Sequence, residues 1–269
     1  GTTSMNVNFG QLNNKGLDLS LSAQIIRNKD WFWSMTLTGG HVMDQIRKIS
    51  QGLKNDIDNP YDSSKPKILF VEGGSQYDIY AMRSAGIDPA TGKEIFIKKN
   101  GEYTFKYDEN ERVAVGNTNP ILQGSWMNTV RYKGFSISLA TSYTFGSDYY
   151  NSTLKNKVEN IDLDYNVDRR VFTDRWKQPG DHTRFLGIGT SSSSSQYSER
   201  FVEKRNELYI SSIQVMYDFA PKAITRLGLR KLAIGFGLSD IAHISTVKFE
   251  RGTDYPYCRG INLIFRPTF

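Results

Sequence analysis

The sequence predicts an all-β protein whose antiparallel strands cross a membrane as part of a β-barrel. Three observations lead to this prediction: long segments alternate apolar and polar residues, their polar positions hold mainly Ser, Thr, Gly, Asn and Gln, and short turns alternate with long polar loops. Strands of about 9–13 residues suit a bilayer, which a tilted strand crosses in ~9–11 residues. A soluble β-sandwich produces similar alternation and stays the alternative on pattern alone.

Composition narrows the classes further. The chain has 269 residues, 34 Lys and Arg against 28 Asp and Glu, and a net charge of +6. Aromatic residues make up 13% of the chain, which excludes general disorder. One cysteine, Cys258, excludes an internal disulfide framework. No segment approaches the ~18 consecutive apolar residues of a membrane helix, and the first residues do not form a signal-peptide pattern.

The alternating segments form three groups along the chain. The first is a hairpin of 17–25 and 31–37 around the turn 27–30, and the second is a hairpin of 126–132 and 135–145 around Lys133 and Gly134. The third group comprises 209–219, 232–238 and 261–265. In its first strand we expect one face to carry Tyr209, Ile213, Val215, Tyr217 and Phe219.

The connections differ in length in a way that predicts topology. Turns at 27–30, 133–134 and 220–228 are short, whereas 51–67, 88–119, 148–205 and 240–259 are long and polar. Outer-membrane barrels combine short periplasmic turns with long extracellular loops. We therefore expect the long loops outside the cell and about 7–10 spanning strands, with 68–83 and 94–107 either spanning or folding at the mouth. A short helix is expected near 153–158.

Several short motifs occur in a fixed order along the chain. They are NNKGLDL at 13–19, EGGS at 72–75, AGIDPATG at 85–92, VGNTNP at 115–120, YKGF at 132–135, RWKQPGD at 175–181, YPYCR at 255–259, and a terminal Phe269. Together they resemble the SusC/RagA family, the TonB-dependent outer-membrane transporters of Bacteroidetes. Asp18 stands where that family usually has Glu, in its strand-opening motif. The resemblance covers nearly the whole chain.

This resemblance implies a fold, a function and partners. The fold is the C-terminal part of a barrel of about 22 strands, spanning residues 1–269, with the plug domain and the TonB box outside this chain. The implied function is import of oligosaccharides or peptides across the outer membrane, driven by TonB and assisted by a SusD-like surface lipoprotein that acts as a lid. A soluble carbohydrate-binding sandwich and a membrane-barrel enzyme remain the alternatives.

Catalytic, metal and nucleic-acid sites find little support. The three histidines, His41, His182 and His243, have no metal-ligand spacing, no G-x-S-x-G motif occurs, and basic residues are scattered. We therefore expect no enzyme, no cofactor and no nucleic-acid partner. The spacing of one acidic segment matches a calcium loop, although Val167 and Thr173 replace its required Gly and Glu. Its four candidate ligands are Asp162, Asp164, Asn166 and Asp168.

Two further sets of residues are assigned roles. The long loop around Trp176 combines aromatic and charged residues, so we expect it to contact the lid lipoprotein. The candidates are Arg175, Trp176, Asp181 and Arg184. Outer-membrane barrels of the kind that this chain resembles end in an aromatic residue. We therefore expect Phe269 to act as an assembly signal rather than only as an interfacial anchor.

Overall fold

A computed structural model describes residues 10–50, 70–162, 164, 166–189, 196–248 and 259–269. Its main feature is a seven-stranded antiparallel sheet in the order β1-β2-β8-β9-β10-β11-β12. The strands are β1 (Gly10–Arg27), β2 (Trp31–Ile49), β8 (Leu122–Tyr132), β9 (Phe135–Tyr150), β10 (Val202–Asp218), β11 (Lys231–Ser245) and β12 (Gly260–Thr268). Among the described residues β1 and β12 do not pair with each other, so the sheet is open.

The predicted hairpins are confirmed. β1 and β2 pair around the turn that begins at Asn28, whose side chain accepts hydrogen bonds from the amides of Asp30 and Trp31. β8 and β9 pair around Lys133 and Gly134, with Lys133 in the left-handed region at φ 50°. β10 and β11 are joined by the short helices α4 (Pro221–Ile224) and η3 (Thr225–Leu227).

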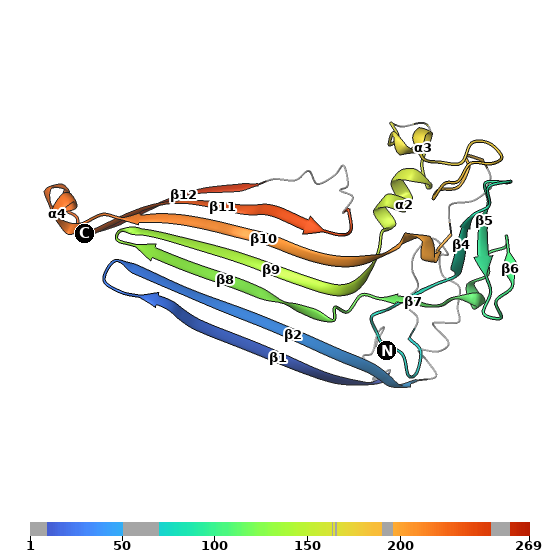
Figure 1. Cartoon of the computed structure of the whole chain (residues 1–269), viewed down its shortest axis with the longest axis horizontal. Coiled ribbons are helices and arrows are strands. Elements are labelled where there is room, and N and C mark those ends of the chain that lie inside the picture. The colour runs from blue at the N-terminus through green and yellow to red at the C-terminus, as the bar shows by residue number, and fades with distance from the viewer. Residues whose placement is uncertain (1–9, 51–69, 163, 165, 190–195, 249–258) are drawn as a thin grey trace, which may run out of the picture.

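The remaining elements gather at the opposite end of the sheet from these turns (Figure 1). The described part of 68–83 and the segment 94–107 contribute strands to two small sheets outside the main one. Of the two expected alternatives, spanning or folding at the mouth, the described strands follow the second. The predicted helix is α2 (Ser152–Val158). The other elements here are β3 (Asp78–Ala81), β4 (Arg83–Ile87), β5 (Glu94–Ile97), β6 (Tyr103–Thr104), η1 (Glu109–Glu111), β7 (Val113–Asn117), α3 (Arg170–Thr173) and η2 (Glu199–Phe201).

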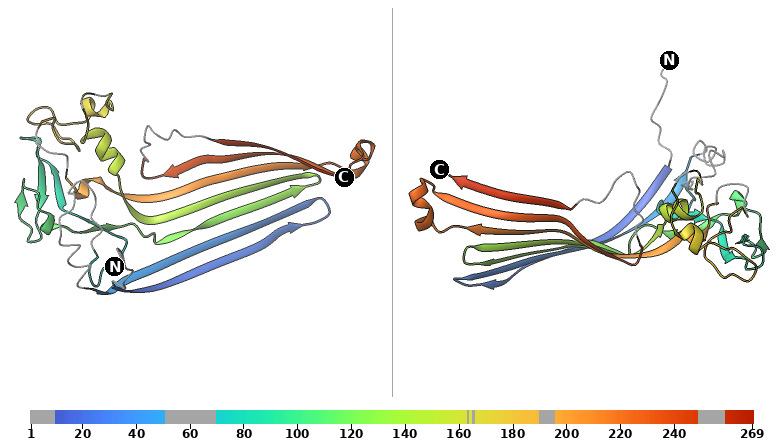
Figure 2. Two further views of the ribbon diagram at one scale, coloured as in Figure 1. Left: turned by 180° about the vertical axis from the view of Figure 1, so that it is seen from behind. Right: turned by 90° about the horizontal axis from the view of Figure 1, so that it is seen from above.

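The main sheet is a single curved layer rather than two packed sheets (Figure 2). Buried hydrophobic packing is concentrated instead in the loop region, where Leu154, Val158, Phe185 and Phe201 form a small core. A soluble sandwich buries one face of each sheet against the other. The described sheet has no such second layer, which excludes the sandwich alternative. None of the described helices has the length and apolar character needed to cross a membrane.

The predicted face of one residue, Tyr209, is wrong, and a local irregularity of β10 is the reason. Tyr209 was expected on the same face as Ile213, Val215 and Tyr217, but the pairing of β10 with β9 and with β11 shifts between Ile210 and Ser212. A β-bulge inserts one residue and so exchanges the faces beyond it. Tyr209 consequently pairs with Ser142 and His243 on the opposite face.

Candidate functional site: a two-faced wall and its loop cluster

The two faces of the main sheet differ in chemistry along adjacent rows of paired residues. Residues that pair across strands share a face, so each row crosses the sheet on one side. One row is apolar on all seven strands: Ile26, Trp33, Val130, Ile137, Val215, Phe236 and Leu263. The next row is neutral and polar or glycine on all seven: Gln24, Ser34, Thr129, Ser138, Gln214, Gly237 and Asn262.

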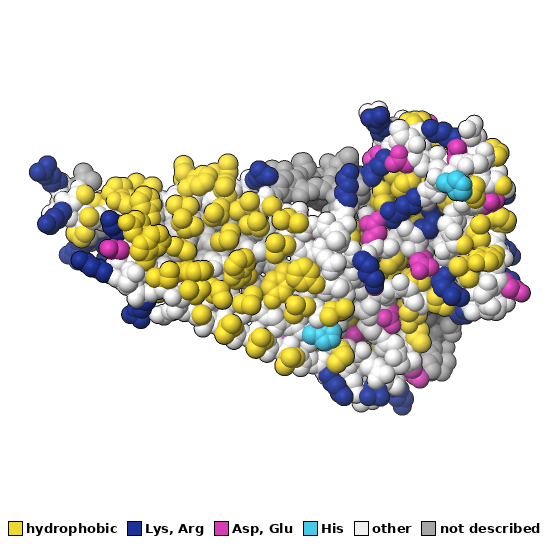
Figure 3. Space-filling view, viewed as in Figure 1, with side chains coloured by type: hydrophobic (Ala, Val, Ile, Leu, Met, Phe, Trp, Pro, Cys, Tyr) yellow, Lys and Arg dark blue, Asp and Glu magenta, His cyan; other side chains and the backbone are white. Residues whose placement is uncertain are grey.

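The apolar face is left uncovered. Leu17 is 75% exposed and Leu263 is 85% exposed, at the two edges of the sheet. Figure 3 shows hydrophobic side chains across the sheet, with Lys and Arg side chains gathered at its two ends. Exposed apolar surface of this extent marks a membrane or interaction surface in a folded protein. The arrangement matches a lipid-facing apolar band.

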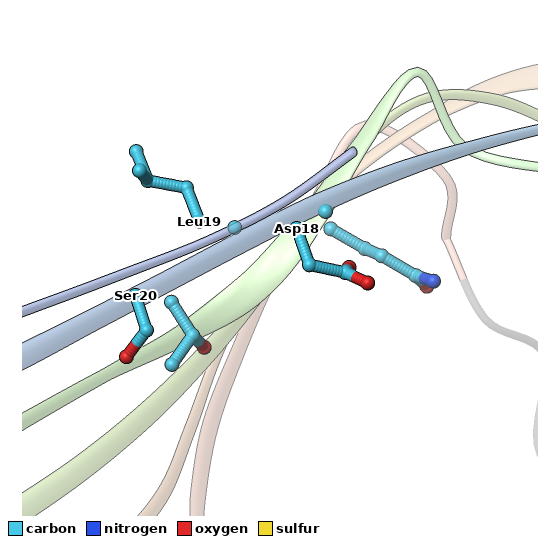
Figure 4. A pocket seen from close by; sticks show the side chains of 7 residues that line it. Asp18, Leu19 and Ser20 are labelled. Atoms are coloured by element: carbon cyan, nitrogen blue, oxygen red, sulfur yellow. The ribbon is translucent and has the colours of Figure 1, made fainter. Parts of the chain in front are cut away.

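The polar face carries hydroxyl groups that bond across strands. Ser22 and Thr36 share a hydrogen bond of 3.1 Å, and Thr38 and Ser125 share one of 2.7 Å. A hollow of about 370 Å³ opens on this face, lined by Asp18, Leu19, Ser20, Thr38, Gly39, Gly40 and Gln123. Figure 4 shows Asp18 and Ser20 on one side of β1 and Leu19 on the other. A side chain at Gly40 would lie 2.5 Å from a carboxylate oxygen of Asp18, so glycine makes room for that carboxylate.

The loop region is held together by a buried charge cluster that sequence patterns did not indicate. Arg200 lies between Glu94 and Glu159, with nitrogen–oxygen distances of 2.9 and 2.8 Å, and all three side chains are buried. The two carboxylates raise the pKa of Arg200 against the opposing effect of its burial. Because the three residues come from β5, η2 and the end of α2, this cluster joins segments far apart in sequence. Only the fold brings them together.

Lys155 lies beside this cluster on α2. It is buried, and its Nζ is 4.5 Å from the ring centroid of Tyr197. Burial lowers its pKa from 10.5 to about 8, although the nearby carboxylates of Glu159 and Glu94 oppose the shift. The structure therefore buries the Lys155 ammonium group in the loop region, where its charged form is less stable than it would be in water.

The four predicted lid-contact residues fall into different environments. Arg175 is only 7% exposed, and its guanidinium donates to the carbonyl oxygens of Val158, Leu186 and Gly187. Its side chain therefore holds the loop from inside and does not lie on the outer surface.

Trp176 is also engaged within the loop region. Its indole Nε1 donates to the carbonyl of Pro89 at 2.9 Å. A side chain at Gly92 would overlap the Trp176 ring, and Gly92 has a positive φ of 69°. Trp176 thus joins two motifs of the sequence, AGIDPATG and RWKQPGD.

Asp181 and Arg184 complete the set. Asp181 accepts hydrogen bonds from the amides of Lys177 and Gln178, which closes a turn. Arg184 is the most accessible of the four, with its side chain 43% exposed and paired with Glu203 at 2.7 Å. Arg184 is therefore the candidate whose side chain a partner can reach directly.

Three of the four calcium candidates, all except Asp164, line a second hollow of about 410 Å³. Its lining residues are Asn156, Lys157, Asn160, Ile161, Asp162, Asn166, Val167 and Asp168. Both carboxylate oxygens of Asp168 accept hydrogen bonds from Arg170, which holds the pKa of Asp168 well below its usual range. Asp162 accepts from the amide of Asp164. Within the described part of the chain no group of three or more His, Cys, Asp or Glu side chains is placed to hold a metal ion. Calcium binding stays a prediction.

The chain's last residue lies on the turn side of the sheet (Figure 1), beyond β12, and is 78% exposed. Its assembly role stays a prediction. Three sequence features lie outside the described residues: Cys258, positions 255–258 of the YPYCR motif, and the loop 51–67.

Comparisons with known proteins agree with this architecture. No protein-family model matches the chain. TonB-dependent receptor P39 of Formosa agariphila is 23% identical over 90% of this chain and 27% of its own length. TonB-dependent receptor P3 of the same organism is 24% identical over 57% of this chain and 17% of its own length.

Solved structures give the same result for the fold. The structure of the RagAB peptide transporter matches with a TM-score of 0.71 at 19% identity, over 89% of this chain and 26% of that chain. The RagAB peptide importer in its open-open state matches with a TM-score of 0.71 at 20% identity, over 88% of this chain and 26% of that chain. This chain thus spans about a quarter of the length of TonB-dependent receptor P39 and of the RagAB transporter chain. Sequence relatives and fold confirm the resemblance drawn from the motifs: the chain has the fold of part of the barrel of a TonB-dependent receptor of the SusC/RagA type.

Proposed function

We propose that the chain forms the C-terminal part of the barrel wall of an outer-membrane importer driven by TonB. The observation that carries this proposal is the pair of adjacent rows, one apolar and one neutral polar, that cross all seven strands. A sheet with these two faces suits lipid on one side and an aqueous or protein-filled lumen on the other. The names of the similar proteins are those of receptors and transporters, which supports transport over catalysis.

The two open edges support a segment that acts as part of a larger assembly. Unpaired backbone groups at the edges of a sheet in lipid cost several kcal/mol each. The preceding barrel strands, the plug and the TonB-contacting segment would come from the rest of the parent protein. The cargo would be an oligosaccharide or a peptide, and a SusD-like lipoprotein would cover the loop end.

Accessibility labelling of the full-length parent tests the membrane topology. In a background with Cys258→Ser, we would introduce cysteine at Tyr103, which is exposed in the loop region, or at Lys133, in the turn between β8 and β9. A membrane-impermeant maleimide should label the first variant in intact cells and the second only after the outer membrane is opened. Equal labelling of both in intact cells would overturn the proposal.

A further inference from the structure

A compact cluster of four side chains lies on the polar face, toward the loop end of β10 and β11. We call Glu207, Tyr209, Asp240 and His243 the inner-wall cluster. The rings of Tyr209 and His243 stack with centroids 4.0 Å apart and an interplanar angle of 25°. Glu207 Oε1 lies 2.9 Å from His243 Nδ1, and the Tyr209 hydroxyl donates to a carboxylate oxygen of Asp240. The cluster thus combines an aromatic pair with two carboxylates.

Two irregularities in neighbouring strands build this cluster. The register between β10 and β11 shifts between Ile210 and Ser212, and on the β11 side the same shift takes in Asp240. Asp240 has a positive φ of 54°, which is uncommon for a residue other than glycine. Bulges re-aim side chains and are concentrated near functional sites. Without the shift, Tyr209 would have faced the same way as Ile213 and Val215, toward the apolar side.

A row of paired residues connects the cluster to a second carboxylate on the same face. Glu207 belongs to a row of paired residues that runs through Thr144, Gln123 and Gly40 to Asp18, the carboxylate in the hollow of Figure 4. The residues of this row between the two carboxylates are neutral. Basic residues on the polar face include Arg131 and Arg266, which lie at the opposite, short-turn end of their strands. Toward the loop end the polar face thus carries Asp18, Glu207 and Asp240. Arg205, two residues before Glu207 on β10, lies there too, and its guanidinium donates to the Ser147 hydroxyl.

We propose that the inner-wall cluster binds a cationic group of the cargo, an ammonium or guanidinium group of a basic peptide. This inference rests on the proposed function and narrows its cargo from oligosaccharides or peptides to peptides. A cation is attracted both to carboxylates and to the face of an aromatic ring. A carboxylate has two acceptor oxygens, and among the described residues one oxygen of Glu207 contacts His243 and one oxygen of Asp240 accepts from Tyr209.

Equilibrium binding to the full-length parent in detergent tests this proposal. The probes are three fluorescent ligands: a peptide of alternating Lys and Gly, a matched peptide of alternating Glu and Gly, and a neutral glucose heptamer. The test variant combines Glu207→Gln with Asp240→Asn. The matched control is Asp218→Asn, which removes a carboxylate from the short-turn end of the same strand β10.

The basic peptide should bind most tightly to the unaltered parent, and its affinity should fall as salt is raised. The double variant should weaken that binding at least tenfold with an unchanged melting temperature, whereas Asp218→Asn should leave it unchanged. Tyr209→Phe keeps the ring and releases Asp240 from the hydroxyl, so it should not weaken binding. The single variant Glu207→Gln keeps the hydrogen bond between Tyr209 and Asp240 and should weaken binding at least threefold. Unchanged affinity of a folded Glu207→Gln parent would overturn the inference even if the double variant is unstable.

Three results would overturn this inference and leave the proposed function standing. The double variant could bind the basic peptide as tightly as the parent, Asp218→Asn could weaken binding equally, or the parent could prefer the neutral or acidic probe. The double variant could also lower the melting temperature and leave the peptide affinity unchanged. That result would mean that the cluster stabilises the parent by packing against another part of it, and it would likewise overturn the inference. Failure of the proposed function is distinct, because the parent would then fail to insert in the outer membrane or to import any cargo.

Discussion

The hydroxyl of Tyr143 on β9 donates a 2.7 Å hydrogen bond to the carbonyl oxygen of Thr38 on β2, across the intervening strand β8. Gly124 on β8 makes this possible, since a side chain there would overlap the Thr38 oxygen and lie 2.7 Å from the Tyr143 hydroxyl. Gly39 leaves similar room, with a distance of 3.1 Å to the same hydroxyl. One aromatic side chain thus ties three strands together over two glycines.

The first prediction follows from this contact. Gly124→Ala in the full-length parent should destabilise the barrel by about 1–3 kcal/mol, because an added methyl group must displace backbone. Gly237→Ala is the control, since its nearest neighbour would lie at an ordinary 3.7 Å. Urea-induced unfolding in lipid vesicles measures both. Equal stability of the two variants would contradict the role of Gly124.

The second prediction concerns the buried Arg200. Arg200→Met leaves Glu94 and Glu159 buried without their common partner, which should cost the loop region about 3–5 kcal/mol. Arg184→Gln removes a half-exposed pair with Glu203 and should cost at most about 1 kcal/mol. Limited proteolysis of the parent should therefore cut the loops of the first variant rapidly and those of the second at the original rate. Similar cutting of both would refute the cluster's structural role.

The third prediction is a pH dependence set by Lys155. Its pKa of about 8 in the folded loop lies below the ordinary 10.5, so the unfolded state binds the proton more tightly. Stability of the loop region should therefore rise with pH between about 8 and 10.5, and the full penalty should apply below pH 8.

Lys155→Met tests that dependence. It should stabilise the loop region at pH 7 by up to roughly 3 kcal/mol and flatten the rise at higher pH. Hydrogen exchange of α2 at pH 7 and pH 9.5, corrected for intrinsic exchange rates, measures the effect. Lys106→Met, at an exposed loop position, is the control. A variant that stays as pH-dependent as the parent would exclude Lys155 as the source.

The fourth prediction separates the lid-contact candidates. Arg184→Glu should reduce co-purification of the SusD-like lipoprotein several-fold while protease resistance of the loops is retained, because its side chain is accessible. Arg175→Met should reduce both, since Arg175 holds three backbone carbonyls inside the loop. Undiminished co-purification with Arg184→Glu would remove Arg184 from the interface. A deletion of 166–183 is less informative because it also removes Arg175 and Trp176.

The fifth prediction concerns Phe269. If this residue is an assembly signal, its removal from the parent should lower the amount of protein in the outer membrane and leave the inserted protein with its normal melting temperature. If it is only an interfacial anchor, its removal should leave the amount unchanged and cost about 1–3 kcal/mol of stability. Quantitative immunoblots of membranes, combined with heat-modifiability on gels, distinguish the two. Normal levels with a lower melting temperature would decide against the signal.

Local sequence determined the strands and their hairpins. A period of two with Leu17, Leu19 and Leu21 on one side and Asp18 and Ser20 on the other specifies both a strand and its apolar side, because successive side chains point to opposite faces. Turn chemistry at Asn28 and at Lys133–Gly134 then sets which strands become neighbours. These signals depend on residues close together in the chain, so they can be recognised without the fold.

The tertiary structure decided what depends on register and on distant partners. A single extra residue at the β10 bulge exchanges the faces beyond it, and nothing in the alternation around Tyr209 marks where that residue is inserted. The burial of Arg175 also depends on distant partners, and its charge does not indicate it. It is buried because carbonyls of 158, 186 and 187 satisfy its guanidinium, and only folding of the loop brings those carbonyls together.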